Sequence, residues 1–152
     1  MQNYDAYSRM IVRSVSHIFK NFLQDQTIEE ILESQAGRED PRVSIAINGM
    51  LKGELVLNFP PKTLTHITTH FFQSASGKSA HRHFEEVAGE IANLITGTFA
   101  NQLQFHNIDV RLSAPEYNEE AMTARSLYDN INLSFNSRFG GFDLDLYYRE
   151  EG

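Results

Sequence analysis

The stretch AHRHFEEVAGEIANLITGTFANQLQ, from Ala80 to Gln104, contains no proline. At about 100° per residue it divides into the two faces of one long helix. One face has the spacing of a buried apolar stripe, and its members are Phe84, Val87, Ala88, Ile91, Leu94, Ile95 and Phe99. The opposite face spans an arc of roughly 60° and holds Glu86, Glu90, Asn93 and Gly97. The pattern predicts a long helix that packs by its apolar face.

Two glycines lie within this predicted helix, Gly89 and Gly97. A glycine inside a helix costs about 1 kcal/mol relative to alanine, so two of them require a reason. The usual reason is the close approach of another backbone. We therefore expect a second polypeptide segment to lie close to the helix at these positions.

Composition limits the classes of function. The chain has 152 residues, with 20 acidic and 13 basic side chains and a net charge of -7. No cluster of Lys and Arg breaks this balance, which argues against nucleic acid as a ligand. Cysteine is absent, so the chain has no disulfide and no thiolate nucleophile or ligand. No signal peptide or apolar run of about 20 residues is present. We expect a soluble cytoplasmic domain over residues 1–152, with no membrane contact.

The flanking segments predict a mixed architecture. A helical apolar repeat covers Tyr4–Leu23, and Pro60-Pro61 opens a shorter helix that fades at Ser74–Lys78. Alternating patterns predict strands at 43–48, 51–59, 108–112, 131–135 and 142–148. Asn48-Gly49 and Gly140-Gly141 are the expected hairpin turns. Segment 28–32 is either a brief helix or an irregular strand, and segment 117–128 is ambiguous. The sum is an α+β fold with a largely antiparallel sheet, two long helices and a shorter helix that is either N-terminal or connecting.

The motif E-x-x-N-x-x-x-G, formed by Glu90, Asn93 and Gly97, resembles the helix motif of the CheC/CheX/FliY chemotaxis phosphatases. The segment INGMLKGELVLNFP, Ile47 to Pro60, is similar to the strand pair that precedes the helices in CheX-like domains. The segment Ile108 to Pro115 is similar to the strand that follows them. The resemblance covers about Val43 to Pro115. A second E-x-x-N is absent, so the chain looks most like CheX, which has one site.

This resemblance implies an activity, namely hydrolysis of the aspartyl phosphate on a CheY-like receiver domain. In the family, the glutamate pairs with the receiver's active-site lysine and the asparagine holds the attacking water. These roles carry over to Glu90 and Asn93. The protein needs no cofactor of its own, because the receiver supplies Mg²⁺. Glu86, Gly89 and Gly97 are the expected partner-binding positions. One position departs from the family, since many members carry Asp or Ser where this chain has Glu86.

Two other interpretations stay open. Glu90 and Asn93 would also fit an ordinary solvated helix surface. A CheX-like scaffold could bind a signalling partner without catalysis. Only the phosphatase would release phosphate from a phosphorylated receiver faster than the receiver does alone.

Histidines raise the question of a metal. His66 and His70 stand four residues apart, a spacing that can bind a metal ion, and His81 and His83 lie near Glu85. Neither group has an evident third ligand, so we expect no metal site.

The resemblance to CheX further implies a homodimer formed through the sheets. The aromatic and apolar residues of 142–148 support this weakly, and so does the need to cover the edges of a small sheet. We expect each protomer to keep its own Glu90 and Asn93 outside the dimer interface.

Overall fold

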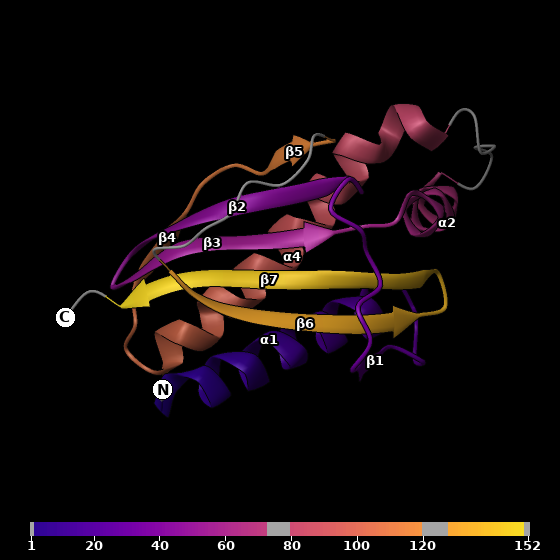
Figure 1. Cartoon of the computed structure of the whole chain (residues 1–152). Coiled ribbons are helices and arrows are strands. Elements are labelled where there is room, and N and C mark those ends of the chain that lie inside the picture. Colours follow the sequence, from indigo (N-terminus) through magenta and orange to yellow (C-terminus); the bar gives the residue numbers. More distant parts are fainter. Residues whose placement is uncertain (1, 73–79, 120–127, 151–152) are drawn as a thin grey trace.

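The computed structural model describes residues 2–72, 80–119 and 128–150 (Figure 1). The helices are α1 (Gln2–Asn21), α2 (Pro61–Phe71), the 3-10 turn η1 (His81–His83) and α4 (Phe84–Phe105). The strands are β1 (Glu29–Ile31), β2 (Arg42–Gly49), β3 (Leu51–Asn58), β4 (Val110–Leu112), β5 (Glu116–Asn118), β6 (Asp129–Ser137) and β7 (Gly140–Glu150). Within these residues no helix is long and apolar enough to cross a membrane.

The described strands form one antiparallel sheet in the order β1-β6-β7-β3-β2-β4, with β5 also paired to β2. The two long helices α1 and α4 run side by side behind this sheet, and α2 lies beyond one end of it (Figure 1). The expected α+β class is therefore confirmed. The shortest of the three described α-helices is the connecting one, α2.

The core lies between the sheet and the two long helices. Alternate strand residues point to this side, and the helices meet them with apolar stripes at helical spacing. The largest fully buried members include Ile11, Ile18, Phe19, Ile45, Ile47, Leu55, Phe59, Phe99, Phe135 and Phe142. On α4 the predicted stripe is buried apart from Leu94, which is half-buried. The aromatic residues of β6, β7 and their turn thus mainly build the core.

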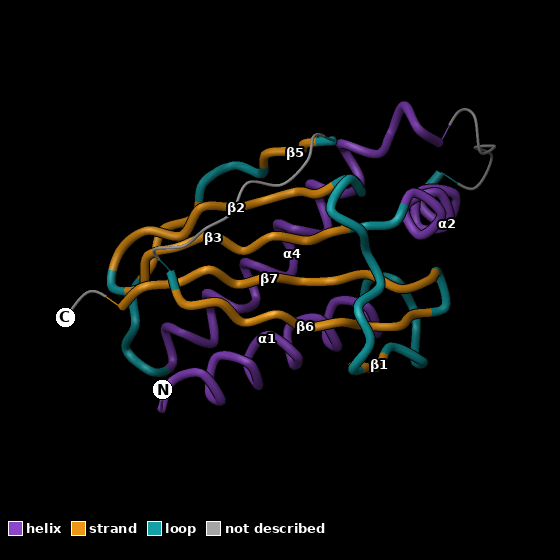
Figure 2. Tube along the Cα trace, viewed as in Figure 1, coloured by secondary structure: helices purple, strands orange, loops and turns teal. Residues whose placement is uncertain are grey.

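Residues 32–41 cross the other face of the sheet, in front of β6 and β7 (Figure 2). Asp143 of β7 holds this crossing segment. Its carboxylate accepts hydrogen bonds from the hydroxyl of Ser34 and from the backbone N–H groups of Gln35 and Ala36, at 2.6 to 3.1 Å. These three hydrogen bonds from the protein replace those that water would make to the buried carboxylate. The segment between β1 and β2 is therefore fixed to the sheet.

The central helix begins later than the sequence predicts. His83 has a non-helical conformation (φ -105°, ψ 2°), and residues 81–83 form a tighter 3-10 turn before α4 starts at Phe84. Such turns are common at helix ends. Glu85 and Glu86 then occupy the first turn of α4, where negative charge interacts favourably with the helix dipole.

Both predicted hairpins form, β2 with β3 and β6 with β7, but their turns differ in detail from the sequence prediction. Ile47 pairs with Gly53, so the β2–β3 connection is longer than a two-residue turn at Asn48-Gly49. These two residues pair with β4 instead. The N–H of Met50 donates to the carbonyl of Asp109 at 3.0 Å, which binds the loop to the segment before β4.

In the β6–β7 hairpin, Ser137 pairs with Gly140, so Arg138 and Phe139 form the turn. Gly140-Gly141 belongs to β7. Burial decides the position, because the Phe139 side chain packs on Phe19 in the core. Gly140 takes the positive φ of 127° that a glycine tolerates at this point.

The described parts of the two segments that the sequence left open contain short strands. The segment around Ile28 contributes β1, which pairs with β6, and Pro115 is followed by β5 on β2. Each strand has three residues, too few to show an alternating pattern. The predicted end of the second helix at Ser74–Lys78 lies outside the described residues, as do residues 120–127.

Candidate active site on helix α4

Glu90 and Asn93 are both exposed on α4, one helical turn apart. Ile91, Ala92 and Ile95 between and beyond them are completely buried. The predicted division of the helix into two faces is therefore confirmed. The core holds the apolar side of the helix, and this packing fixes where the two polar side chains stand.

Neither of these side chains makes a hydrogen bond or an ion pair within the part of the chain that the structure describes. Isolated surface residues are common, but here a carboxylate and an amide occupy the same face three residues apart. Their hydrogen-bonding capacity is free for another molecule. The carboxylate can accept from a cation, and the amide can both donate and accept.

The two residues open onto a groove of about 320 Å³ between α4 and β5. The helix side of this groove is formed by Glu85, Glu86, Gly89, Glu90 and Asn93. The facing wall is formed by Val43, Pro115 and Tyr117. We call this hollow the α4–β5 groove. Four of the five predicted site residues line it, and the fifth, Gly97, does not.

The glycines behave differently from the expectation of a close backbone neighbour. A Cβ atom on Gly89 would lie 3.4 Å from Cγ of Pro115, so a proline side chain and not a backbone faces this position. A Cβ atom on Gly97 would meet nothing within 4 Å. Among the described glycines, close backbone contacts occur at Gly53 on β3, opposite Tyr147 and Tyr148, and at Gly49 on β2, opposite Asp109 and Val110. Within the chain, the expected reason for the helix glycines is therefore wrong.

Tyr117 belongs to the groove although the sequence did not indicate it. Its hydroxyl donates a hydrogen bond of 2.8 Å to Oε1 of Glu119, and the same oxygen lies 3.4 Å from Nε2 of His81. Burial of the ring, then the hydrogen bond to Glu119 and the charges of Glu119 and Glu85, raise the pKa of Tyr117 well above its usual value. The phenol therefore stays protonated and donates to Glu119.

The helix side of the groove is acidic. Glu85, Glu86 and Glu90 line it, and no lysine or arginine does so among the described residues. Oε2 of Glu86 lies 3.6 Å from Nδ1 of His83, and the Glu86 side chain is 72% exposed. An approaching surface with positive charge would be attracted to this groove.

The predicted histidine pairs have structural contacts. Nδ1 of His66 lies 2.9 Å from the carbonyl of Phe139, and Nδ1 of His70 lies 3.1 Å from the Arg138 guanidinium. Both contacts hold α2 against the β6–β7 turn. Across the described residues, three or more potential metal ligands of the His, Cys, Asp or Glu type do not come together.

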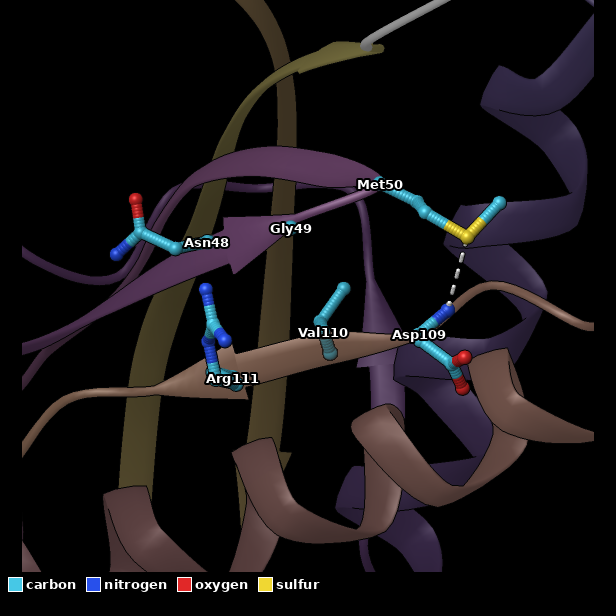
Figure 3. Close-up of a pocket in the computed structure, with 6 residues that line it drawn as sticks. All are labelled: Asn48, Gly49, Met50, Asp109, Val110 and Arg111. Atoms are coloured by element: carbon cyan, nitrogen blue, oxygen red, sulfur yellow. Dashed lines mark hydrogen bonds between the residues drawn. The ribbon is translucent and has the colours of Figure 1, made fainter.

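A larger hollow of about 430 Å³ lies at the β2–β3 connection, beside β4 (Figure 3). It is lined by Asn48, Gly49, Met50, Asp109, Val110 and Arg111. At this hollow the backbone N–H of Asp109 donates a 3.4 Å hydrogen bond to the sulfur of Met50. No predicted site residue lines this hollow.

Residues 42–132, more than half of the chain, match the family model described as chemotaxis phosphatase CheX. The chain belongs to the CheX family. This match includes β2, β3, α4 and β5, and therefore every element that forms the α4–β5 groove. No curated protein sequence matches the chain.

Solved structures of the CheX family and its relatives share the fold. The CheX protein from Vibrio vulnificus is 17% identical with a TM-score of 0.78, over 94% of this chain and 96% of that one. CheX from Borrelia burgdorferi, solved in a CheX-CheY-BeF3-Mg complex, is 15% identical with a TM-score of 0.79, over 95% and 98%. FliY from Thermotoga maritima is 16% identical with a TM-score of 0.66, over 96% and 90%. The expected CheC/CheX-like fold is confirmed.

Proposed function

We propose that this chain hydrolyses the aspartyl phosphate of a CheY-like receiver domain, with Asn93 and Glu90 as its functional pair. The observation that carries the proposal is the placement of these two side chains. They are exposed, free of partners among the described residues, and fixed on a helix face beside a groove. Membership of the CheX family supports the reaction class. The complex of a CheX protein with CheY supports the kind of partner.

The proposed chemistry requires little covalent participation from the protein. The water oxygen forms a bond to phosphorus, the bond between phosphorus and the aspartyl oxygen breaks, and the freed carboxylate keeps the electron pair. The water loses its proton to the phosphate product or to solvent. The receiver's own Mg²⁺ neutralises the phosphoryl oxygens. Placing the water in line is the remaining task, and positioning of this kind is worth about 10²-fold or more.

Asn93 suits this task because its amide oxygen accepts a hydrogen bond from water and stays neutral at every working pH. Glu90 has a different role. Its carboxylate would pair with the receiver's active-site lysine and so fix the register of the two proteins. The single-turn separation brings water and lysine to neighbouring points on one helix face.

The test is phosphate release from phosphorylated CheY-type receivers encoded in the same genome as this chain. Addition of the purified protein should raise the release rate at least about tenfold above that of the receiver alone. Binding of a phosphorylated receiver with no change in its rate would favour the alternative, a non-catalytic interaction domain. A protein that neither binds the phosphorylated receiver nor raises its rate of phosphate release would contradict the proposal.

We also propose that the protein is a homodimer joined through its sheet. On the β1 side, β1 pairs only with Ser134–Asn136 of β6, so residues 129–133 have no strand neighbour on that side among the described residues. An open edge of this kind favours pairing with a second copy. The α4–β5 groove lies at the opposite side of the sheet order, so each protomer would keep its own site. Light scattering at micromolar concentration tests the state, and a mass near 17.4 kDa would contradict it.

A further inference from the structure

The ring of Tyr117 occupies a defined place in the wall that faces Glu90 and Asn93. Tyr117 pairs with Val43 across the β5–β2 ladder. Paired residues point to the same face of a sheet, and Val43 is completely buried in the core beneath the helices. Tyr117 is half-buried and lines the groove. Its ring therefore points to the helix side, with its inner part on the core and its outer part in the groove.

Several contacts fix this wall before any partner arrives. Pro115 packs against Gly89 of α4. The Tyr117 hydroxyl donates to Glu119, which in turn lies 3.4 Å from His81 in the turn that precedes α4. The ring is thus held at both ends. A rigid aromatic side chain loses little entropy when a partner packs on it.

The two walls of the groove differ in character. The α4 wall is acidic and carries Glu90 and Asn93, whereas Pro115 and Tyr117 give the β5 wall apolar surface. A partner that enters must therefore present positive charge to one side and an apolar group to the other. A receiver loop with a lysine near its phosphorylated aspartate meets the first requirement.

We infer that Tyr117 is a partner-positioning residue, whose ring is the surface on which the apolar part of the receiver's phosphorylated loop packs. This inference rests on the proposed function and adds the second wall of its docking site. Tyrosine is among the residues that most often dominate the energy of protein interfaces. Tyr117 contributes to affinity and alignment. Its hydroxyl already donates a hydrogen bond to Glu119 and is therefore not available as a proton donor in the reaction.

Steady-state kinetics with a phosphorylated CheY-type receiver separate Tyr117 from Asn93. Tyr117→Ala should raise KM at least about tenfold, the level of an interface anchor, and change kcat by less than about twofold. Tyr117→Phe keeps the ring and should stay within about threefold of the wild-type KM. Asn93→Ala should show the reverse pattern, a lower kcat with little change in KM. Tyr4→Ala, at an exposed tyrosine of α1, is the control with no expected effect.

Since the inner part of the ring packs on the core, Tyr117→Leu provides a variant that keeps apolar packing beneath the groove. Circular dichroism and a thermal melt identify the variants that fold. An unchanged KM in a folded Tyr117→Leu or Tyr117→Ala protein would overturn the role of Tyr117 and leave the phosphatase proposal intact. A wild-type protein without phosphatase activity would overturn the proposed function. An equal rise in KM in the Tyr117→Phe and Tyr117→Ala proteins would also contradict packing of the receiver on the ring.

Discussion

Two regions of this molecule combine a carboxylate with side-chain amides and use them in opposite ways. On the outer face of the sheet, Asp145 is 6% exposed and accepts hydrogen bonds from Asn58 at 3.1 Å and Asn132 at 2.8 Å. On α4, Glu90 and Asn93 carry the same functional groups, but both are exposed and neither makes a hydrogen bond or ion pair with a described residue. The chemistry is alike, and the surroundings decide what it does.

The difference separates stability from activity. A buried carboxylate must be hydrogen-bonded, and leaving its donors without a partner costs about 1–3 kcal/mol. The Asp145 cluster is therefore part of what holds β3, β6 and β7 together. The α4 pair adds little to folding because water can satisfy both groups in the free protein. We expect changes on the sheet to affect unfolding, and changes in the groove to affect turnover.

The largest expected effect is that of Asn93→Ala. It should lower kcat for hydrolysis of the phosphorylated receiver by about 10²-fold or more, because the attacking water loses its orientation. Receiver binding should stay near the wild-type level, and the free energy of unfolding should change by less than about 0.5 kcal/mol. Phosphate-release assays and a urea titration measure the two quantities. Asn101→Ala, also exposed on α4, is the control. Wild-type turnover by Asn93→Ala would remove this residue from the mechanism.

Next in size is the opposite experiment, Asp145→Ala. It should lower the free energy of unfolding by about 2 kcal/mol, because the amides of Asn58 and Asn132 lose their acceptor. The kcat for hydrolysis of the receiver's aspartyl phosphate should remain within about twofold of wild type when measured well below the melting temperature. Urea unfolding and the same phosphate assay test this. A loss of turnover without a loss of stability would break the comparison, since the sheet would then take part in the site.

The helix face that carries the candidate site could be predicted because its signal is local. Glu90, Asn93 and the apolar stripe lie within one segment, and the angular step of a helix places them without any knowledge of the rest of the chain. The same argument located α1, and the Pro60-Pro61 pair indicated the start of α2. It failed at the hairpin turns, where long-range contacts decide. Burial of Phe139 moves one turn away from Gly140-Gly141, and pairing with β4 lengthens the connection at Asn48-Gly49.

Tyr117 was missed for a related reason. Strand β5 has three residues and exists through its pairing with β2, more than 70 residues earlier in the chain. The only local signal is one aromatic residue between Glu116 and Asn118, directly after Pro115. That pattern is too short to predict a strand. The helix half of the groove was therefore visible in the sequence, and the strand half required the structure.

A smaller effect is expected for Glu90→Ala. It should lower kcat/KM about tenfold, partly through weaker receiver binding, because one charge-assisted hydrogen bond to the receiver lysine is lost. Added salt should reduce the difference between the variant and the wild type, since screening weakens a surface ion pair. Kinetics at low and high salt measure this, with the exposed Glu33→Ala as control. A kcat/KM equal to that of wild type at low salt would contradict the assigned role of Glu90.

The smallest expected effect is that of removing metal ions, which should leave the free protein unchanged. His66 and His70 have the spacing of a metal pair, but Nδ1 of His66 lies at the carbonyl of Phe139 and His70 faces the cationic Arg138. A third ligand is absent among the described residues, and stable protein sites for zinc use three or four. Treatment with EDTA should not shift the melting temperature, and elemental analysis should find no stoichiometric metal. Mg²⁺ should be required only in the phosphatase assay, through the receiver. Stoichiometric zinc, or a melting temperature that falls with EDTA, would show that the polar contacts of α2 are part of a metal site.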